Sequence, residues 1–143
     1  FPRPMLNDPH YDFSFSGLKT AVRYFLERES ARMADRKFLA NVAASVELAI
    51  VEVLVEKTVR AAGKLKAKTI LLAGGVAANG PLRLALATAV AERLPGTKFF
   101  EPPLEFCTDN AAMIAMAGYV HAKRRRFDQV KKMEADPHWE LGR

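Results

Sequence analysis

Apolar residues recur at helical spacing over residues 36–62, which predicts one long helix. Asp35 stands where a carboxylate can accept from the free amides of the first turn, and Gly63 follows the last periodic residue, where left-handed backbone often ends a helix. The same periodicity predicts a shorter helix from Ser16 to about residue 29, capped by the Ser16 hydroxyl. The inner stripe of the long helix comprises Phe38, Leu39, Val42, Val46, Ala49, Ile50, Val53 and Leu54.

Two apolar segments predict short strands of a small parallel or mixed sheet. Residues 68–73 predict the first strand, and its apolar run Ile70-Leu71-Leu72-Ala73 shows no alternation, which is typical of a strand buried on both faces. Residues 98–100 predict a second strand, and the segment from Gly80 to Leu94 between them predicts a connecting helix. Residues 12–16 alternate Phe with Ser, a period-two pattern that predicts a further short strand. The fold class is therefore α/β.

Each of the two apolar strands is followed by a loop that carries polar side chains. The turn Gly74-Gly75-Val76-Ala77-Ala78-Asn79 follows the first strand, and a loop over residues 101–108 leads from the second strand to Asp109, which opens another apolar helix. Parallel strands joined by one helical crossover place both loops at the same edge of the sheet, where open α/β sheets bind ligands. We therefore predict that Asn79 and Asp109 are neighbours.

The chemistry of these loop residues is open on pattern alone. A strand, a glycine turn and a helix start form a phosphate- or nucleotide-facing element, yet Gly74 and Gly75 are also what any tight turn requires. Asn79 could cap its helix or turn its amide toward the base or ribose of a nucleotide. Asp109 could be an N-cap or a hard oxygen ligand for a divalent cation, although a single carboxylate cannot hold a metal.

Composition indicates one globular domain in a reducing compartment. Half of the 143 residues are hydrophobic, and charged residues interrupt the apolar runs before the ~18 residues of a membrane span. The N-terminus carries no secretory leader, so we expect a cytoplasmic protein with no membrane partner. The single cysteine, Cys107, cannot form an internal disulfide and is expected to be a small buried filler. His10, His121 and His138 form no zinc-peptidase pair and are expected on the surface.

The net charge of +6 reflects 22 basic against 16 acidic residues, with concentrations at residues 123–126 and 131–132. Such a cluster suits a polyanion such as tRNA, and equally suits a solvated helix end whose cations complement the helix dipole. The chain begins at Phe1 without an initiator Met, so we expect a fragment of a longer protein. We expect residues 1–126 to form the folded part and residues 127–143 a polar tail.

Four strings together resemble one family, TsaD, also called YgjD or Gcp. They lie at residues 1–5, 12–20, 74–79 and 105–115, and read FPRPM, DFSFSGLKT, GGVAAN and EFCTDNAAMIA. That family transfers a threonylcarbamoyl group from threonylcarbamoyl-adenylate to the 6-amino group of the tRNA adenosine 3′ of the anticodon. The resemblance implies the C-terminal part of a two-lobed actin-like, ribonuclease-H-like fold, since family members are roughly twice this length.

The resemblance also implies roles for individual residues. Asn79 matches the family's adenylate-contacting asparagine, with Gly74 and Gly75 beside it at the substrate, and Asp109 matches its metal-ligating aspartate. One divalent ion per full-length subunit, iron or zinc, is implied, and its two histidine ligands belong to the part of the family absent from this chain. The isolated chain is therefore expected to be inactive. Implied partners are tRNA, threonylcarbamoyl-adenylate and accessory proteins of the same modification pathway.

One segment departs from the family pattern, and two rival functions stay open. Val46-Glu47 stands where Phe-Gln is more usual, which puts a charge near the cleft if that helix face points there. One rival is a lobe of another actin-like enzyme such as a sugar kinase, which should lack the FSGLK string at residues 15–19. The other is a non-catalytic lobe that binds a partner.

Overall fold

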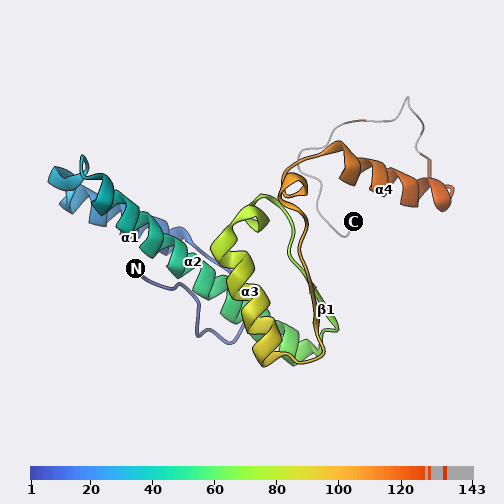
Figure 1. The fold of residues 1–143 in the computed structure, drawn as a ribbon, viewed down its shortest axis with the longest axis horizontal. Coiled ribbons are helices and arrows are strands. Elements are labelled where there is room, and N and C mark those ends of the chain that lie inside the picture. The colour runs from blue at the N-terminus through green and yellow to red at the C-terminus, as the bar shows by residue number, and fades with distance from the viewer. Residues whose placement is uncertain (128, 130–133, 135–143) are drawn as a thin grey trace. The chain divides into compact units, whose positions relative to one another are not determined.

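The computed structural model describes residues 1–127, 129 and 134 and divides the chain into two compact units, residues 1–107 and residues 108–143 (Figure 1). Each unit is described by itself. The first unit contains α1 (Ser16–Arg28), η1 (Ser30–Arg32), α2 (Arg36–Leu65), β1 (Thr69–Leu71), η2 (Gly75–Ala78), α3 (Gly80–Arg93), β2 (Lys98–Phe100) and η3 (Leu104–Phe106). The described part of the second contains α4 (Ala111–Lys123). The predicted boundary at residue 127 stays a prediction, because most of that tail, with His138 in it, lies outside the described residues.

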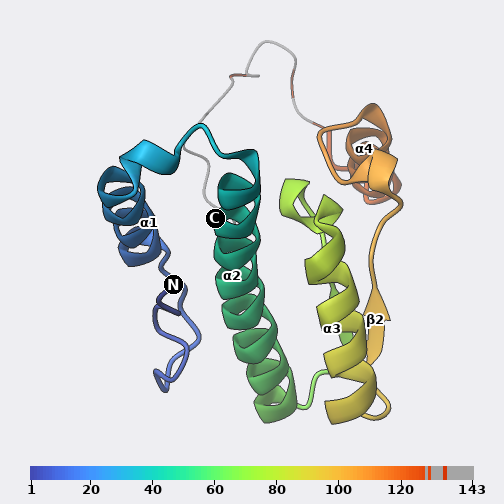
Figure 2. The same cartoon turned by 60° about the vertical axis from the view of Figure 1, so that its left-hand side comes forward.

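The described strands form a two-stranded parallel sheet, as predicted. β1 pairs with β2 in the register Thr69 to Lys98, Ile70 to Phe99 and Leu71 to Phe100. α3 connects the two strands and lies alongside α2 (Figure 2). The helix-rich α/β class is therefore confirmed.

The core of the first unit lies between α2, α3 and one face of the sheet. Its two clusters of buried residues are Val59, Ala62, Ile70, Ala89 and Val90, and then Val51, Leu82 and Leu86. The prediction that the first strand is buried on both faces is wrong for this chain. Ile70 points into the core, whereas Leu71 is 73% exposed, because the helices cover only the face that carries Ile70.

An ion pair also joins α2 to α3. Arg93 donates to both carboxylate oxygens of Glu56, at 2.7 and 3.0 Å. Hydrogen bonds from Arg93 hold the pKa of the Glu56 carboxyl below its ordinary value, against a smaller opposing effect of desolvation. The pair therefore stabilises the helix contact at neutral pH and loses that contribution when acid protonates Glu56, although solvent screens so exposed a pair.

The N-terminal segment is held on α2 by cations. The Lys57 side chain is fully buried and its Nζ donates to the Met5 carbonyl at 2.8 Å, while Arg60 donates to the Asp8 carbonyl at 2.6 Å. The predicted strand over residues 12–16 is wrong, since residues 12–15 are irregular, Ser16 already belongs to α1, and Phe13 is 46% exposed. Its alternation has no neighbouring strand among the described residues to pair with.

The predicted helix ends are partly confirmed. Asp35 is the N-cap of α2 and accepts from the amides of Lys37 and Phe38 at 2.9 and 3.2 Å. The predicted cap at Ser16 is wrong, because Phe15 precedes the helix and Ser16 is its first residue. The predicted end at Gly63 is also wrong, because the helix runs to Leu65 and Lys66 takes the left-handed conformation at φ 52°.

Gly63 instead lies inside α2 at the contact with the end of α3. A Cβ there would lie 3.4 Å from Cδ2 of Leu94, the residue that follows α3. That distance is an ordinary van der Waals contact, so Gly63 marks where the end of α3 packs on α2.

By length and composition α2 is the one helix in the described part of the chain that could cross a membrane. In the first unit this helix is buried along part of its surface and makes polar contacts. It carries Glu52 in an ion pair with Arg3, a buried Lys57, and an apolar face packed on α3. Core helices of globular proteins meet the same criterion, so α2 is no positive sign of membrane insertion.

The cap of α2 can be tested by substitution. We expect Asp35→Ala to lower the free energy of unfolding by about 1 kcal/mol, because two amides of the first turn lose their acceptor. Asp35→Asn keeps an acceptor oxygen and should stay close to the unmutated chain. Urea unfolding followed by circular dichroism measures both, and equal losses in the two variants would contradict the capping role.

Candidate functional site: the glycine turn and the groove beside it

The turn after β1 is shaped by one glycine. Gly74 has φ 88°, a left-handed conformation that is strained for other residues, and its carbonyl accepts from the amide of Ala77 at 2.9 Å. η2 then leads to Asn79, where α3 begins. Gly75 has no positive φ, and a Cβ at this position would meet no described atom within 4 Å. The fold therefore requires glycine at position 74 but not at position 75.

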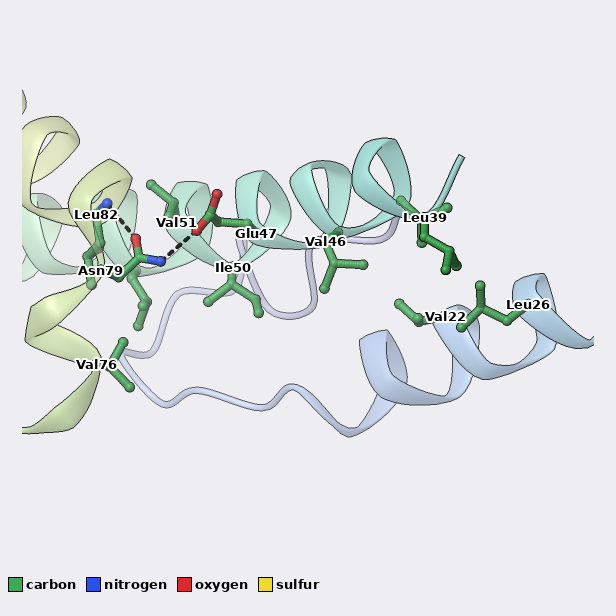
Figure 3. A pocket seen from close by; sticks show the side chains of 13 residues that line it. Val22, Leu26, Leu39, Val46, Glu47, Ile50, Val51, Val76, Asn79 and Leu82 are labelled. Atoms are coloured by element: carbon green, nitrogen blue, oxygen red, sulfur yellow. Dashed lines mark hydrogen bonds between the residues drawn. The ribbon is translucent and has the colours of Figure 1, made fainter. Parts of the chain in front are cut away.

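Asn79 uses both ends of its side-chain amide. Oδ1 accepts from the amide of Leu82 at 2.8 Å, so Asn79 caps α3. Nδ2 donates to Oε1 of Glu47 on α2 at 2.6 Å (Figure 3). Because the amide nitrogen carries two N–H groups and Glu47 takes one, capping leaves a donor for a ligand. The two roles that the sequence left open are therefore compatible.

An apolar groove opens beside this pair of side chains. Its volume is about 560 Å³, within the range of small-molecule sites, and Glu47 and Asn79 are the polar side chains on its walls. Figure 3 shows both at one end of the groove, with Val22 and Leu26 of α1 at the other. The remaining lining residues are Leu39, Val42, Ala43, Val46, Ile50, Val51, Leu54, Val76 and Leu82. Such a wall suits a flat, largely apolar group that makes few hydrogen bonds.

The edge of the sheet is arranged as the sequence predicted, up to Cys107. Because β1 and β2 are parallel, the turn at residues 74–79 and the loop from residue 101 leave from the same edge. Asp109 belongs to the second unit, so its predicted proximity to Asn79 stays a prediction. A structure with these two side chains at opposite ends of the sheet would contradict that prediction.

Asp109 is not a helix cap. Asn110 is the N-cap of α4, and its Oδ1 accepts from the amide of Met113 at 2.9 Å. The N-cap alternative for Asp109 is therefore wrong, since the helix begins one residue later than predicted. Within the described part of the chain, no group of three or more His, Cys, Asp or Glu side chains could hold a metal ion. These residues do not make a complete metal site.

The remaining candidates match their expected environments. Cys107 is buried at 2% exposure, which confirms its role as a core filler. His10 is a half-exposed surface residue between Asp8 and Asp12, and His121 is exposed on α4.

Sequence reasoning missed Arg83, on the first turn of α3, which contacts both loops at the sheet edge. It also flagged Glu47 only as a departure from a family pattern, without a partner. The contact partners of Arg83 and Glu47 lie far away in sequence, so no local pattern could have identified them.

Comparison with known proteins identifies the family. A family model described as tRNA N6-adenosine threonylcarbamoyltransferase, TsaD, matches residues 1–116. The curated protein of that name from Thermotoga neapolitana is 49% identical over 140 residues, which cover 96% of this chain and 40% of the relative. Its counterpart from Moorella thermoacetica is 50% identical over 129 residues, which cover 89% of this chain and 36% of the relative.

The chain combines a small parallel sheet, a glycine turn and an apolar groove in one α/β unit. It belongs to the tRNA N6-adenosine threonylcarbamoyltransferase (TsaD) family, as the four strings predicted. The chain spans 40% or less of the length of these relatives.

The contact between Glu47 and Asn79 can be tested in the chain itself. We expect Glu47→Ala to lower the free energy of unfolding by about 1 kcal/mol, because the Asn79 amide loses a half-buried acceptor. Glu47→Gln keeps an acceptor oxygen and should cost clearly less. Urea unfolding of the three proteins measures the difference, and a Gln variant as unstable as the Ala variant would contradict the hydrogen-bonding role.

Proposed function

We propose that this chain is the C-terminal part of an enzyme that transfers the threonylcarbamoyl group from threonylcarbamoyl-adenylate to the exocyclic amine of the tRNA adenosine 3′ of the anticodon. The observation that carries the proposal is the family match over residues 1–116, which includes the glycine turn and Asn79. The proposal includes an actin-like, ribonuclease-H-like architecture for the complete enzyme. It also places the reaction in the cytoplasm, with tRNA and accessory proteins of the same pathway as partners.

The proposed adenylate site is the turn at residues 74–79 together with the groove. The free N–H of Asn79 would donate to the nucleotide, and the apolar groove wall would contact the base. Gly75, whose position leaves space for a ligand, would lie against the adenylate backbone. Gly74 would act through the shape of the turn.

The reaction requires little covalent help from the protein. The substrate is a mixed anhydride, so the amine nitrogen attacks its carbonyl carbon, a C–N bond forms, and AMP leaves as the C–O bond to phosphate breaks. A site for this step must hold the carbonyl near the amine and exclude water. The described residues would contribute by binding and orienting the adenylate.

Asp109 is proposed as one ligand of a divalent ion, iron or zinc. Its carboxylate is a hard oxygen donor of the kind such ions accept. The described residues provide no complete set of ligands for the ion, so the remaining ligands would come from elsewhere in the full-length protein.

The role of Asn79 is tested in a polypeptide of the relatives' full length that carries this sequence. Asn79→Ala and Asn79→Ser should both weaken binding of AMP by about 1 to 3 kcal/mol, because each loses the amide donor. Both variants lose the hydrogen bond to Glu47, but Asn79→Ser retains a capping oxygen, so Asn79→Ala should be less stable than Asn79→Ser by about 1 kcal/mol. Calorimetry and thermal unfolding of the same samples separate the effects. Full AMP affinity in Asn79→Ser would mean that Asn79 is only a cap.

The proposed role of Asp109 predicts how residues 1–143 alone should bind metal ions. Titration calorimetry with iron(II), zinc and magnesium should show negligible specific affinity, because one carboxylate cannot hold an ion. The isolated chain should also have no transferase activity. Tight one-to-one binding that Asp109→Ala abolishes would show that this chain contains a complete site.

A further inference from the structure

Arg83 bridges the two loops that leave the sheet edge. Its Nη1 donates to the Ala77 carbonyl in the glycine turn at 2.8 Å. Its Nη2 donates to the Pro102 carbonyl after β2 at 2.7 Å and lies 3.0 Å from Oε1 of Glu101. A weaker contact joins Nη1 to Sγ of Cys107 at 3.6 Å. One side chain therefore contacts both segments at once.

The Arg83 side chain and two of the residues that it contacts are largely buried. The Arg83 side chain is only 16% exposed, and two residues that it contacts, Ala77 and Cys107, are 0% and 2% exposed. A guanidinium is a planar fork with donors fixed in two directions, which suits two carbonyl groups on separate segments. A lysine ammonium would keep the charge opposite Glu101 but lacks this planar fork.

We propose that Arg83 is a positioning residue that fixes the glycine turn, residues 74–79, relative to the segment of residues 101–107. The inference rests on the proposed function, in which the turn carries the adenylate-binding Asn79 and the other segment leads to Asp109. Arg83 acts through Ala77, two residues before Asn79, and through the segment that ends two residues before Asp109. It is assigned no contact with the adenylate or the reacting atoms.

Arg83 lies outside the apolar core, so its effect on the two loops can be distinguished from an effect on overall stability. The residue belongs to neither apolar cluster between α2, α3 and the sheet. Loss of its side chain should therefore loosen the two loops while the core stays packed. Arg93 lies on the same helix and also forms an ion pair, but with Glu56 on α2, which makes it a matched control.

Hydrogen exchange tests the bridge without an activity assay. In a polypeptide of the relatives' full length that carries this sequence, Arg83→Met should speed exchange at the amides of Ala77 and Cys107. Core amides of α3 such as those of Leu86 and Val90 should keep their protection. Arg93→Met should leave both loops unchanged. Unchanged exchange in Arg83→Met, or faster exchange in only one of the two segments, would overturn the proposal.

Kinetics with threonylcarbamoyl-adenylate, tRNA and the accessory proteins of the pathway test the consequence for the site. Arg83→Met should lower kcat by up to about 100-fold, because small misplacement of reacting groups is costly. Arg93→Met should keep the unmutated kcat. Arg83→Lys should restore little of the loss, and full recovery in that variant would show that charge alone matters and would overturn the bridge. If the unmutated protein has no activity, the proposed function fails, while hydrogen exchange still decides whether Arg83 couples the loops.

Discussion

Helix α2 packs along α3 through two adjoining apolar clusters, and both strands of the sheet pack against the same clusters. Ile70 of β1 joins one cluster, which sets the sheet against the helices. The contact also brings Glu47 of α2 within hydrogen-bonding distance of Asn79, at the start of α3. The geometry of the candidate site is therefore a consequence of how two helices pack, because neither helix carries both polar groups.

The long apolar helix tolerates several charged residues because each has a local partner. Lys57 is fully buried, and a buried ammonium without a partner would be very costly. The Met5 carbonyl accepts from it, and Glu52 pairs with Arg3 in the same N-terminal segment. Glu52 and Lys57, which interrupt the apolar run, therefore anchor the N-terminal segment on α2.

Sequence patterns predicted the elements well where the signal is local. The cap at Asp35 depends on a side chain and amides two and three residues away, so spacing alone could identify it. The strand predicted over residues 12–16 failed because alternation cannot show whether a neighbouring strand exists. The end of α2 was misplaced because the helix continues past Gly63 to Leu65, and Lys66 takes the left-handed conformation that ends it. For the site, the turn and Asn79 were predictable, but the partners Glu47 and Arg83 come from packing.

The placement of Glu47 also constrains how an adenylate can lie in the proposed site. The Glu47 carboxylate contacts the cap residue of α3 and therefore lies near the positive end of that helix. Its negative charge offsets part of the positive potential that attracts anions to a helix N-terminus. A phosphate beside Glu47 would face like charge across an apolar, poorly solvated wall. The base and ribose are therefore expected on the Glu47 side of Asn79, and the phosphate on the side of Gly74 and Gly75. In that orientation the acyl-phosphate would lie beside the glycine turn, at the sheet edge from which the segment after β2 also leaves.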